Sequence, residues 1–304
     1  MVEQWYIRVP MKRGEAIRRE LIGKETLDLS LKIRREGSSL LLPVTEQLEH
    51  SERGDFEPLP GLQVLPRHEI VGGIAIMQDC DPAGAANILS SRPSLHSVLC
   101  ATSDVSGEYR TREFRVLAGT PITQTEVIEY GNRFTVDLST AYFSSRLSSE
   151  RHRILERMRD GEIVLDMFTG VGPFAITLAA RAALVVASDI NPRAIILMLA
   201  NLAQNRTKNV LPVLADAHHL SAIIPWQFDR IIMNLPLSGN VFLADGFRLC
   251  KPGGVIHYYC LVSGKGEHNE LIHELGGETI EERVVRSYSP GQWHAVYDVK
   301  VKDK

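Results

Sequence analysis

Residues 162–192 read EIVLDMFTGVGPFAITLAARAALVVASDINP, and this stretch decides the fold. An apolar run ends at Asp166, a loop with two glycines follows, and a helical stretch leads to a second β-branched run that ends at Asp189. Strand, helix and strand at this spacing predict two parallel strands joined by a crossover helix. Similar apolar runs follow at 210–216, 228–236 and 253–262. The C-terminal half is therefore predicted to be a doubly wound α/β domain whose parallel sheet is covered on both faces.

The rest of the chain divides around this domain. Residues 282–301 hold two extended runs joined by a Pro-Gly pair, which predicts an antiparallel hairpin at the sheet edge. Residues 1–50 combine strand-like and helix-like runs and are interpreted as a small α+β module. The polar, proline-containing stretch 51–66 is interpreted as a linker, and the mixed short runs of 67–140 as a middle α+β domain.

Composition is ordinary for a soluble globular protein, with 44% hydrophobic and 23% charged residues among 304. No apolar run approaches the roughly 18 residues that a membrane helix needs, and no N-terminal signal pattern is present, so we expect a cytoplasmic protein without a membrane segment. The four cysteines, Cys80, Cys100, Cys250 and Cys260, form no CxxC pair. This spacing predicts reduced thiols and no metal site.

Charge does not by itself identify a partner. The formal net charge is −3, which neither favours nor excludes a nucleic acid, because phosphate contacts need only one basic face. The first fifty residues do carry a group of cations, and both a solvated surface and an RNA contact are consistent with them: Arg8, Lys12, Arg13, Arg18, Arg19, Lys32, Arg34 and Arg35.

Polar residues stand at the end of each predicted parallel strand. Asp166 ends the first strand, Asp189 the second and Asp216 the third, while Asn234, Leu235 and Pro236 end the fourth. Ligands of open α/β sheets bind at this carboxyl edge. Gly170 and Gly172 would let the backbone approach such a ligand closely.

Two cofactors compete for this edge. The spacing Gly170-x-Gly172-x-x-Ala175 fits the dinucleotide fingerprint, although that match alone is weak. Asp166 separates the two, because a carboxylate at the tip of the first strand is unfavourable beside a pyrophosphate and favourable beside a methionine ammonium. Each acid could instead cap a helix or a turn. Taken together the acids favour S-adenosylmethionine, with Asp189 on the ribose and Asp216 near the adenine amino group.

Longer motifs carry a resemblance to a family. The segments 166–174, 188–205, 229–236, 253–259 and 284–301, together with SGEYRTREFRVLAG at 106–119 and VDLSTAYFSSRLSSER at 136–151, closely resemble the archaeal/eukaryotic-type tRNA (guanine-N1)-methyltransferases that act at tRNA position 37. The resemblance covers nearly the whole chain. It implies a tRNA-contacting N-terminal module and a class I catalytic domain at 141–304 that binds S-adenosylmethionine. Ser145 and Thr169 depart from it, since the family often has proline and alanine there.

The resemblance also implies roles for individual residues. Glu150 matches the family's general base, Arg110 the group that faces O6 of guanine, and Asn234 a group that orients the base edge. Without the resemblance, Glu150 would be read as an acid in the first turn of a helix, and Arg112 could be mistaken for Arg110. The cofactor would be held by Asp166, Phe168, Gly170, Gly172, Asp189, Asn191, Asp216 and Asn234. The substrate would be contacted by Tyr142, Arg146 and Pro236, for which ordinary packing or a surface ion pair is equally consistent with the sequence.

Three further functions remain open at this point. A related enzyme transfers the aminocarboxypropyl group of the same cofactor, but its relatives lack the Asn-Leu-Pro that this chain has at 234–236, which favours methyl transfer. The second is additional methylation of a wyosine-type precursor at the same tRNA position, and the third is a non-catalytic tRNA-binding role. We expect tRNA as the partner, with no obligate protein partner and no membrane.

Overall fold

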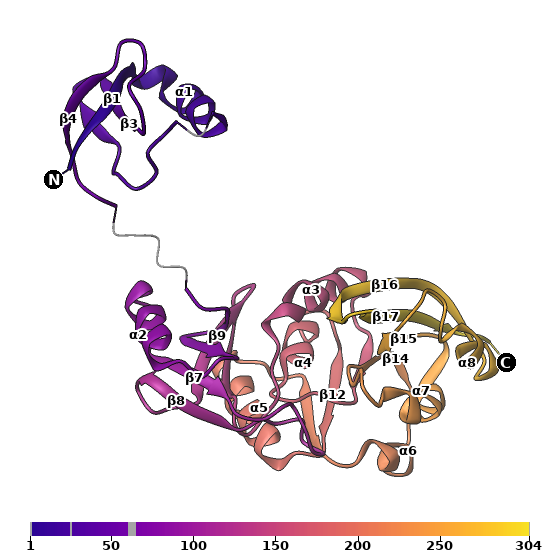
Figure 1. The fold of residues 1–304 in the computed structure, drawn as a ribbon. Helices are drawn as coiled ribbons and strands as arrows, with labels where there is room; N and C mark the ends of the chain where they lie inside the picture. Colours follow the sequence, from indigo (N-terminus) through magenta and orange to yellow (C-terminus); the bar gives the residue numbers. More distant parts are fainter. Residues whose placement is uncertain (1, 25, 60–64, 304) are drawn as a thin grey trace. The chain divides into compact units, whose positions relative to one another are not determined.

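The computed structural model describes residues 2–24, 26–59 and 65–303. The chain divides into two compact units, residues 1–65 and 66–304, which are described separately (Figure 1). No helix among the described residues is long and apolar enough to cross a membrane.

Unit 1 is an antiparallel sheet of strand order β2-β3-β1-β4. It consists of β1 (Val2–Pro10), β2 (Arg34–Glu36), β3 (Ser39–Val44) and β4 (Glu52–Phe56), with helix α1 (Met11–Gly23) between β1 and β2. The helix packs through Leu21 against Val9, Leu42 and Val44. The predicted first strand, helix and second strand of this module are therefore present.

The predicted linker was wrong over β4. Residues 52–56 pair with β1 in register from Val2 opposite Phe56 to Tyr6 opposite Glu52. Only one of the five residues is both apolar and buried, Phe56, which is 1% exposed. The strand is at the sheet edge, so its polar side chains remain in solvent and leave no apolar alternation in the sequence.

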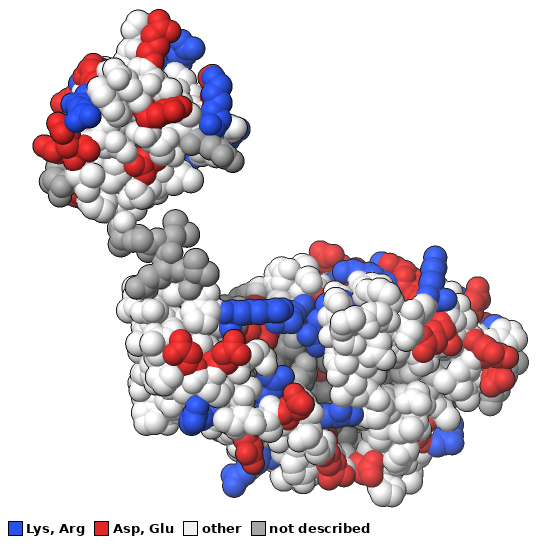
Figure 2. All heavy atoms as spheres, in the orientation of Figure 1, with Lys and Arg blue, Asp and Glu red and all other residues white. Residues whose placement is uncertain are grey.

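Many basic side chains of unit 1 are paired with acids. Arg8 forms an ion pair with Glu36, and Lys32 forms one with Glu57. Arg18 and Arg19 both reach Glu15 on the same helix. Acidic and basic groups consequently alternate over the visible face of this unit (Figure 2).

Unit 2 begins with a four-stranded sheet of order β5-β6-β7-β8. Its elements are β5 (His68–Val71), β6 (Ile74–Met77), helix α2 (Pro82–Ser91), β7 (Ser97–Ala101) and β8 (Phe114–Gly119). A disulfide joins Cys80, after β6, to Cys100 on β7, so the prediction of four reduced thiols was wrong; Cys250 and Cys260 are free and buried. The two bonded cysteines are 20 residues apart, and only the parallel pairing of β6 with β7 brings them together.

A separate hairpin of β9 (Gln124–Glu129) and β10 (Asn132–Asp137) follows, and it is attached to helix α5 (Pro192–Gln204). Asn201 on α5 accepts a hydrogen bond from the Thr135 backbone N–H at 2.7 Å and donates to the Thr135 carbonyl at 3.1 Å. Asn205 makes the same pair of bonds with Arg133. Phe134 and Val136 of the hairpin lie in the same apolar core as the main sheet, so residues 67–140 do not form a compact unit of their own.

The main sheet has seven strands in the order β13-β12-β11-β14-β15-β17-β16. The parallel strands are β11 (Ile163–Asp166), β12 (Leu184–Asp189), β13 (Val210–Leu214), β14 (Phe228–Met233) and β15 (Cys250–Val262). β16 (Gly277–Ser289) and β17 (Gln292–Val301) run antiparallel to each other, and β17 lies between β15 and β16. The predicted strands and the C-terminal hairpin are confirmed.

Helices cover both faces of this sheet (Figure 1). On one face α3 (Ser148–Arg157), α4 (Pro173–Leu178) and α5 contribute Ile154, Phe174 and Met198 to the first core. On the other, α6 (Leu220–Ile223), α7 (Leu243–Leu249) and α8 (Asn269–Glu274) contribute Leu220, Leu243 and Ile272 to the second. The predicted doubly wound fold is present, and its strand order reverses between β11 and β14, where a ligand is expected.

Candidate active site

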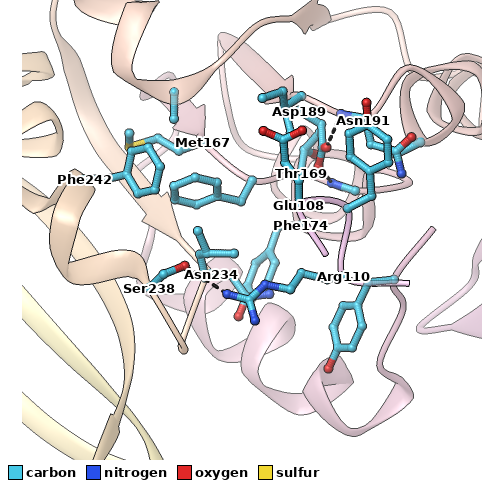
Figure 3. Close-up of a pocket in the computed structure, with 18 of the residues that line it drawn as sticks. Glu108, Arg110, Met167, Thr169, Phe174, Asp189, Asn191, Asn234, Ser238 and Phe242 are labelled. Carbon is cyan, nitrogen blue, oxygen red and sulfur yellow. Dashed lines mark hydrogen bonds between the residues drawn. The ribbon is translucent and has the colours of Figure 1, made fainter. Parts of the chain in front are cut away.

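A cavity of about 410 Å³ lies at the reversal point of the sheet. Its walls come from the loops that follow β11, β12, β13 and β14, from the loop 107–110 and from the segment before α3 (Figure 3). Eight of the predicted site residues line it: Arg110, Tyr142, Phe168, Gly170, Asp189, Asn191, Asp216 and Asn234.

The loop after β11 needs its two glycines for different reasons. Gly170 has φ 56°, and a Cβ there would meet only the Tyr142 carbonyl oxygen at 3.5 Å, which leaves the backbone open toward the cavity. Gly172 has φ 89°, and its Cβ would lie 2.9 Å from Cγ of Met198 on α5. Gly172 does not line the cavity; it allows the turn into α4.

Asp166 lies under this loop and is fully buried. Neither carboxylate oxygen has a hydrogen-bond partner among the described residues. Burial raises the pKa of Asp166 to about 7, and the charge of nearby Asp189 acts in the same direction. A buried carboxyl group without partners is costly unless a ligand supplies them. It adjoins the cavity through Met167 and Phe168 without lining it.

The acids after β12 and β13 are held by backbone groups. Asp189 accepts hydrogen bonds from the N–H of Gly170 at 2.7 Å and of Asn191 at 2.9 Å, while burial raises its pKa. Asn191 caps α5 and donates to the Thr140 carbonyl at 2.8 Å. Asp216 accepts from the His218 N–H at 2.9 Å. Both acids therefore do accept hydrogen bonds from turn or helix-start N–H groups, as an acid that caps a turn would. Both also line the cavity, where their remaining lone pairs can accept from a ligand.

Aromatic groups form the wall beside Asp216. The Phe242 ring stacks on His218 at 4.1 Å between centroids and meets Phe168 edge-on at 5.1 Å. His218 is oriented by Asp245, 3.0 Å from its Nδ1. These rings offer a flat apolar surface of the kind that a purine base contacts.

Arg110 and Asn234 face each other across the cavity (Figure 3). Arg110 stands in the left-handed region with φ 54° and donates to the Ser238 hydroxyl at 3.0 Å. Non-glycine residues are uncommon in this region, and of the four described in this chain only Arg110 lines the cavity. The Asn234 side-chain oxygen is buried without a partner among the described residues. Arg112 does not line the cavity, so of these two neighbouring arginines Arg110 is the one that belongs to it.

Glu150 lies outside the cavity lining. It is 1% exposed, accepts a hydrogen bond from Arg153 Nε at 2.9 Å and lies 3.4 Å from the Tyr259 hydroxyl. Nη2 of Arg283 approaches its other oxygen to 2.9 Å in an ion pair. The Tyr259 ring packs on Phe174, which does line the cavity. Glu150 is therefore one layer behind the wall.

A buried polar network positions Arg153, the buried cation that is paired with Glu150. Arg153 also binds Asp298, whose pKa is lowered because His257 and Arg153 offset its burial. Arg230 donates to His257 Nε2 at 2.6 Å, so Nδ1 must carry the proton that His257 donates to Asp298. Arg230 is in turn bonded to Glu162 at 2.7 Å.

Of the residues predicted to contact the substrate, only Tyr142 lines the cavity. It is 42% exposed. Arg146 does not line the cavity. It forms a surface ion pair with Glu69 at 3.1 Å, which is the alternative to substrate contact that the sequence left open for this residue. Pro236 is also outside the lining, and its carbonyl accepts from the Leu261 N–H at 3.2 Å.

Sequence reasoning missed several groups of the wall. Glu108 and Ser238 line the cavity, and each stands within four residues of a predicted site residue. Arg151 also lines it, with its guanidinium 5.6 Å from the Phe143 and Phe174 ring centroids. The motifs that contain Glu108 and Arg151 were recognised, and Ser238 lies two residues after one, but a sequence does not show which neighbour of a motif residue points into the cavity.

The comparisons with known proteins agree with this geometry. Residues 125–284 match the TRM5/TYW2 methyltransferase domain, and residues 7–52 match the tRNA methyltransferase 5 N-terminal domain. The tRNA (guanine(37)-N(1))-methyltransferase Trm5b of Pyrococcus abyssi is 38% identical over 97% of this chain and 98% of its own length. The tRNA(Phe) (4-demethylwyosine(37)-C(7)) aminocarboxypropyltransferase of Methanocaldococcus jannaschii is 31% identical over 77% of this chain and 97% of its own.

Solved structures are similar to this chain over nearly its whole length. Trm5b from Pyrococcus abyssi superposes with a TM-score of 0.79 at 35% identity, over 99% of this chain and all of that one. A complex of aTrm5 with tRNALeu gives 0.76 at 29% identity, over 98% and 99% of the two chains. The chain belongs to the TRM5/TYW2 methyltransferase family.

Proposed function

We propose that the protein transfers the methyl group of S-adenosylmethionine to N1 of guanosine at position 37 of tRNA. The observation that carries the proposal is one cavity, at the reversal point of a class I sheet, that brings Arg110 and Asn234 together above the buried, unpartnered Asp166. A tRNA substrate implies action in the cytoplasm.

The residues present fit the cofactor. The Asp166 carboxylate lacks partners that an ammonium group would supply, and Gly170 leaves the backbone open. Asp189 and Asp216 keep lone pairs for hydroxyl and amino groups, beside the rings of Phe168 and Phe242. The cofactor, when bound, supplies an electrophilic methyl group.

The chain's own groups suit the chemistry of guanine. Methylation at N1 requires loss of the N1 proton, and negative charge then develops on O6. The Arg110 guanidinium offers a fixed positive charge for O6, and the Asn234 amide offers both a donor and an acceptor to the base edge. The target base must leave its stack to enter the cavity.

Glu150, a carboxylate in the first turn of α3, is our candidate for the general base. In the described state it is paired with Arg153 and Arg283. To accept a proton from the base it must leave at least one of these cations, and Arg283 is the more exposed of the two, at 41% against 10%. Movement of Arg283 on substrate binding is therefore part of the proposal.

Two observations favour methylation over aminocarboxypropyl transfer. The N-terminal module of the chain matches the tRNA methyltransferase 5 model, and the aminocarboxypropyltransferase relative aligns with only 77% of the chain. Methylation of a wyosine precursor would use the same cofactor on a different substrate and at a different acceptor atom, because N1 is already substituted in such a tricyclic base.

The test uses purified protein, labelled S-adenosylmethionine and an unmodified tRNA transcript with guanosine at position 37. We expect N1-methylguanosine there and S-adenosylhomocysteine as by-product. Methylthioadenosine as by-product would identify aminocarboxypropyl transfer instead. Methylation only of a tRNA that already carries the wyosine precursor would identify that precursor as the true substrate.

Glu150→Gln tests the base in the same assay under single-turnover conditions. We expect transfer to slow by about 10²- to 10⁴-fold with cofactor binding unchanged. Glu156→Gln on the same helix is the matched control, because that side chain is exposed and distant from the cavity lining. A near-normal rate for Glu150→Gln would remove Glu150 from the mechanism without affecting the assignment of product.

A further inference from the structure

Ser238 lies in the loop after β14, directly before the short helix η3 (Gly239–Phe242). It occupies the N-cap position of η3, where a serine side chain usually accepts a hydrogen bond from the helix backbone. Among the described residues the Ser238 hydroxyl makes no such bond. It lines the cavity instead and accepts a hydrogen bond from Nη2 of Arg110 at 3.0 Å (Figure 3). This side chain therefore contacts the site and not its own helix.

The loop that carries Ser238 is fixed to the main sheet. The Ser238 N–H donates to the Leu235 carbonyl at 3.2 Å, which closes a turn. The Leu261 N–H of β15 donates to the Pro236 carbonyl in that turn, also at 3.2 Å. Helix η3 then packs against the same strand. The hydroxyl is consequently presented to the cavity from a firm support.

The turn 107–110 that carries Arg110 has a weaker support. The bond that closes it, from the Arg110 N–H to the Gly107 carbonyl, is long at 3.3 Å, and residues 107–109 are exposed. Among the hydrogen bonds between described residues, only the one to Ser238 joins this turn to the main sheet and its loops. It bridges 128 residues of sequence. The position of the guanidinium in the cavity therefore depends on this hydroxyl.

The partner that Arg110 has in the cavity is uncharged. Arg110 forms no ion pair with a described residue, although Glu108 and Asp189 line the same cavity. A long arginine side chain loses rotamer freedom when its planar fork is held, and a hydrogen bond to a hydroxyl holds it without an opposite charge. Ser238 thus directs the guanidinium while its full positive charge stays available to a ligand.

We propose that Ser238 is a positioning residue for methyl transfer, which holds the Arg110 guanidinium toward O6 of the target guanine. The inference rests on the proposed function and deepens it. Negative charge develops on O6 only as the N1 proton leaves, so a correctly placed cation stabilises the transition state more than the bound substrate. Loss of the Ser238 hydroxyl should therefore affect the rate of transfer and not the binding of tRNA.

The experiment compares Ser238→Ala with the wild-type protein and full-length tRNA. We expect kcat to fall about tenfold, the loss typical of one hydrogen bond to a charged group, with the KM for tRNA and the Kd for cofactor unchanged. Ser238→Thr keeps the hydroxyl and should restore the wild-type kcat. A wild-type kcat in Ser238→Ala, or a kcat in Ser238→Thr as low as in Ser238→Ala, would overturn the inference.

Two further variants separate this role from general loosening of the loop. In an Arg110→Ala background, Ser238→Ala should cause no additional loss, because both changes remove the same interaction. Ser103→Ala is the matched control, since its hydroxyl accepts from the Glu113 N–H at 2.9 Å at the other end of the same loop. It should keep the wild-type kcat. Multiplied losses in the double variant, or an equal loss in Ser103→Ala, would contradict the proposed role.

Nitrogen-relaxation NMR of the arginine side chains tests the contact in the free protein, whichever product is formed. The Nε–H of Arg110 should be ordered in the wild-type protein and mobile in Ser238→Ala. Equal mobility in the two proteins would overturn the inference even where N1-methylguanosine is produced. Absence of that product with an ordered Arg110 would count against the proposed function alone, so the two failures are distinct.

Discussion

Asp166 is the residue whose state should control cofactor binding. Its pKa of about 7 results from complete burial, to which the charge of nearby Asp189 adds. A cofactor ammonium group next to it would favour the ionised form and lower that pKa. Binding should then release a proton when the free protein is still protonated.

The sign of the pH dependence follows from this shift. Because the folded pKa lies above the ordinary aspartate value, the folded state holds the extra proton between about pH 4 and pH 7. The unfolding free energy of the cofactor-free protein should therefore fall as pH rises through that range, and cofactor affinity should rise. Calorimetric titration at about pH 6 and pH 7.5 should show tighter binding at the higher pH and proton release at the lower.

Asp166→Asn is the corresponding variant. It cannot ionise, so its affinity should be weaker and nearly independent of pH, and it should release no proton on binding. An unchanged pH dependence in this variant would assign the effect to another group. Asp229→Asn is the comparison, because that acid is paired with Lys251 and does not line the cavity, and it should leave the pH dependence of cofactor affinity unchanged.

At the residue scale the sequence predicted the contents of the site better than its geometry. The acids at the strand ends were found because strand ends in a parallel sheet converge on one edge. Glu150 was also found, through its motif, but its ion pair with Arg283 joins α3 to a strand more than 130 residues later in the chain. Such partners depend on the packing of whole elements, which a local motif does not contain.

Among the elements, the β9–β10 hairpin depends on one buried ion pair. Glu129, at the end of β9, accepts from Arg151 of α3 at 2.9 Å and 2.6 Å in a bidentate arrangement. The two side chains are 6% and 2% exposed. Arg151 also lines the cavity, so this pair connects the hairpin to the site wall.

Glu129→Ala should leave the Arg151 charge buried without its partner. We expect the unfolding free energy to fall by about 3–5 kcal/mol, measured by urea denaturation. Arg133→Ala removes the exposed partner of Glu126 on the same hairpin, whose pair is 55% and 39% exposed, and should cost about 1 kcal/mol or less. Similar losses of unfolding free energy in both variants would show that the buried pair contributes no more to stability than the exposed pair.

Element prediction succeeded where apolar runs are buried and failed at exposed edges. The strands of the parallel sheet are nearly continuous apolar runs because helices cover both of their faces. β4 reads ERGDF and β9 reads QTEVIE, and neither was identified as a strand. Their positions are fixed by pairing with β1 and β10, and the charges between their few buried residues conceal the pattern.

The molecule as a whole is built from two units with separate cores. Val9, Leu21 and Leu42 belong to the core of unit 1, and the core clusters of unit 2 contain no residue before Val71. A protein of residues 66–304 should therefore fold, unfold cooperatively and bind S-adenosylmethionine with an unchanged Kd. Circular dichroism melting and calorimetric titration check this, and a loss of cofactor binding would show that unit 1 supports the site.

Strand β17 has one further consequence, for the order in which the protein is made. It is synthesised after β15 and β16, yet it lies between them and forms hydrogen bonds with both. Until β17 inserts, the chain therefore carries two long strands with no partner on the sides that will face β17. Such open edges invite pairing with other chains. Insertion of the last strand closes both edges at once, so a slow insertion step would be the point at which this sheet is most open to intermolecular pairing.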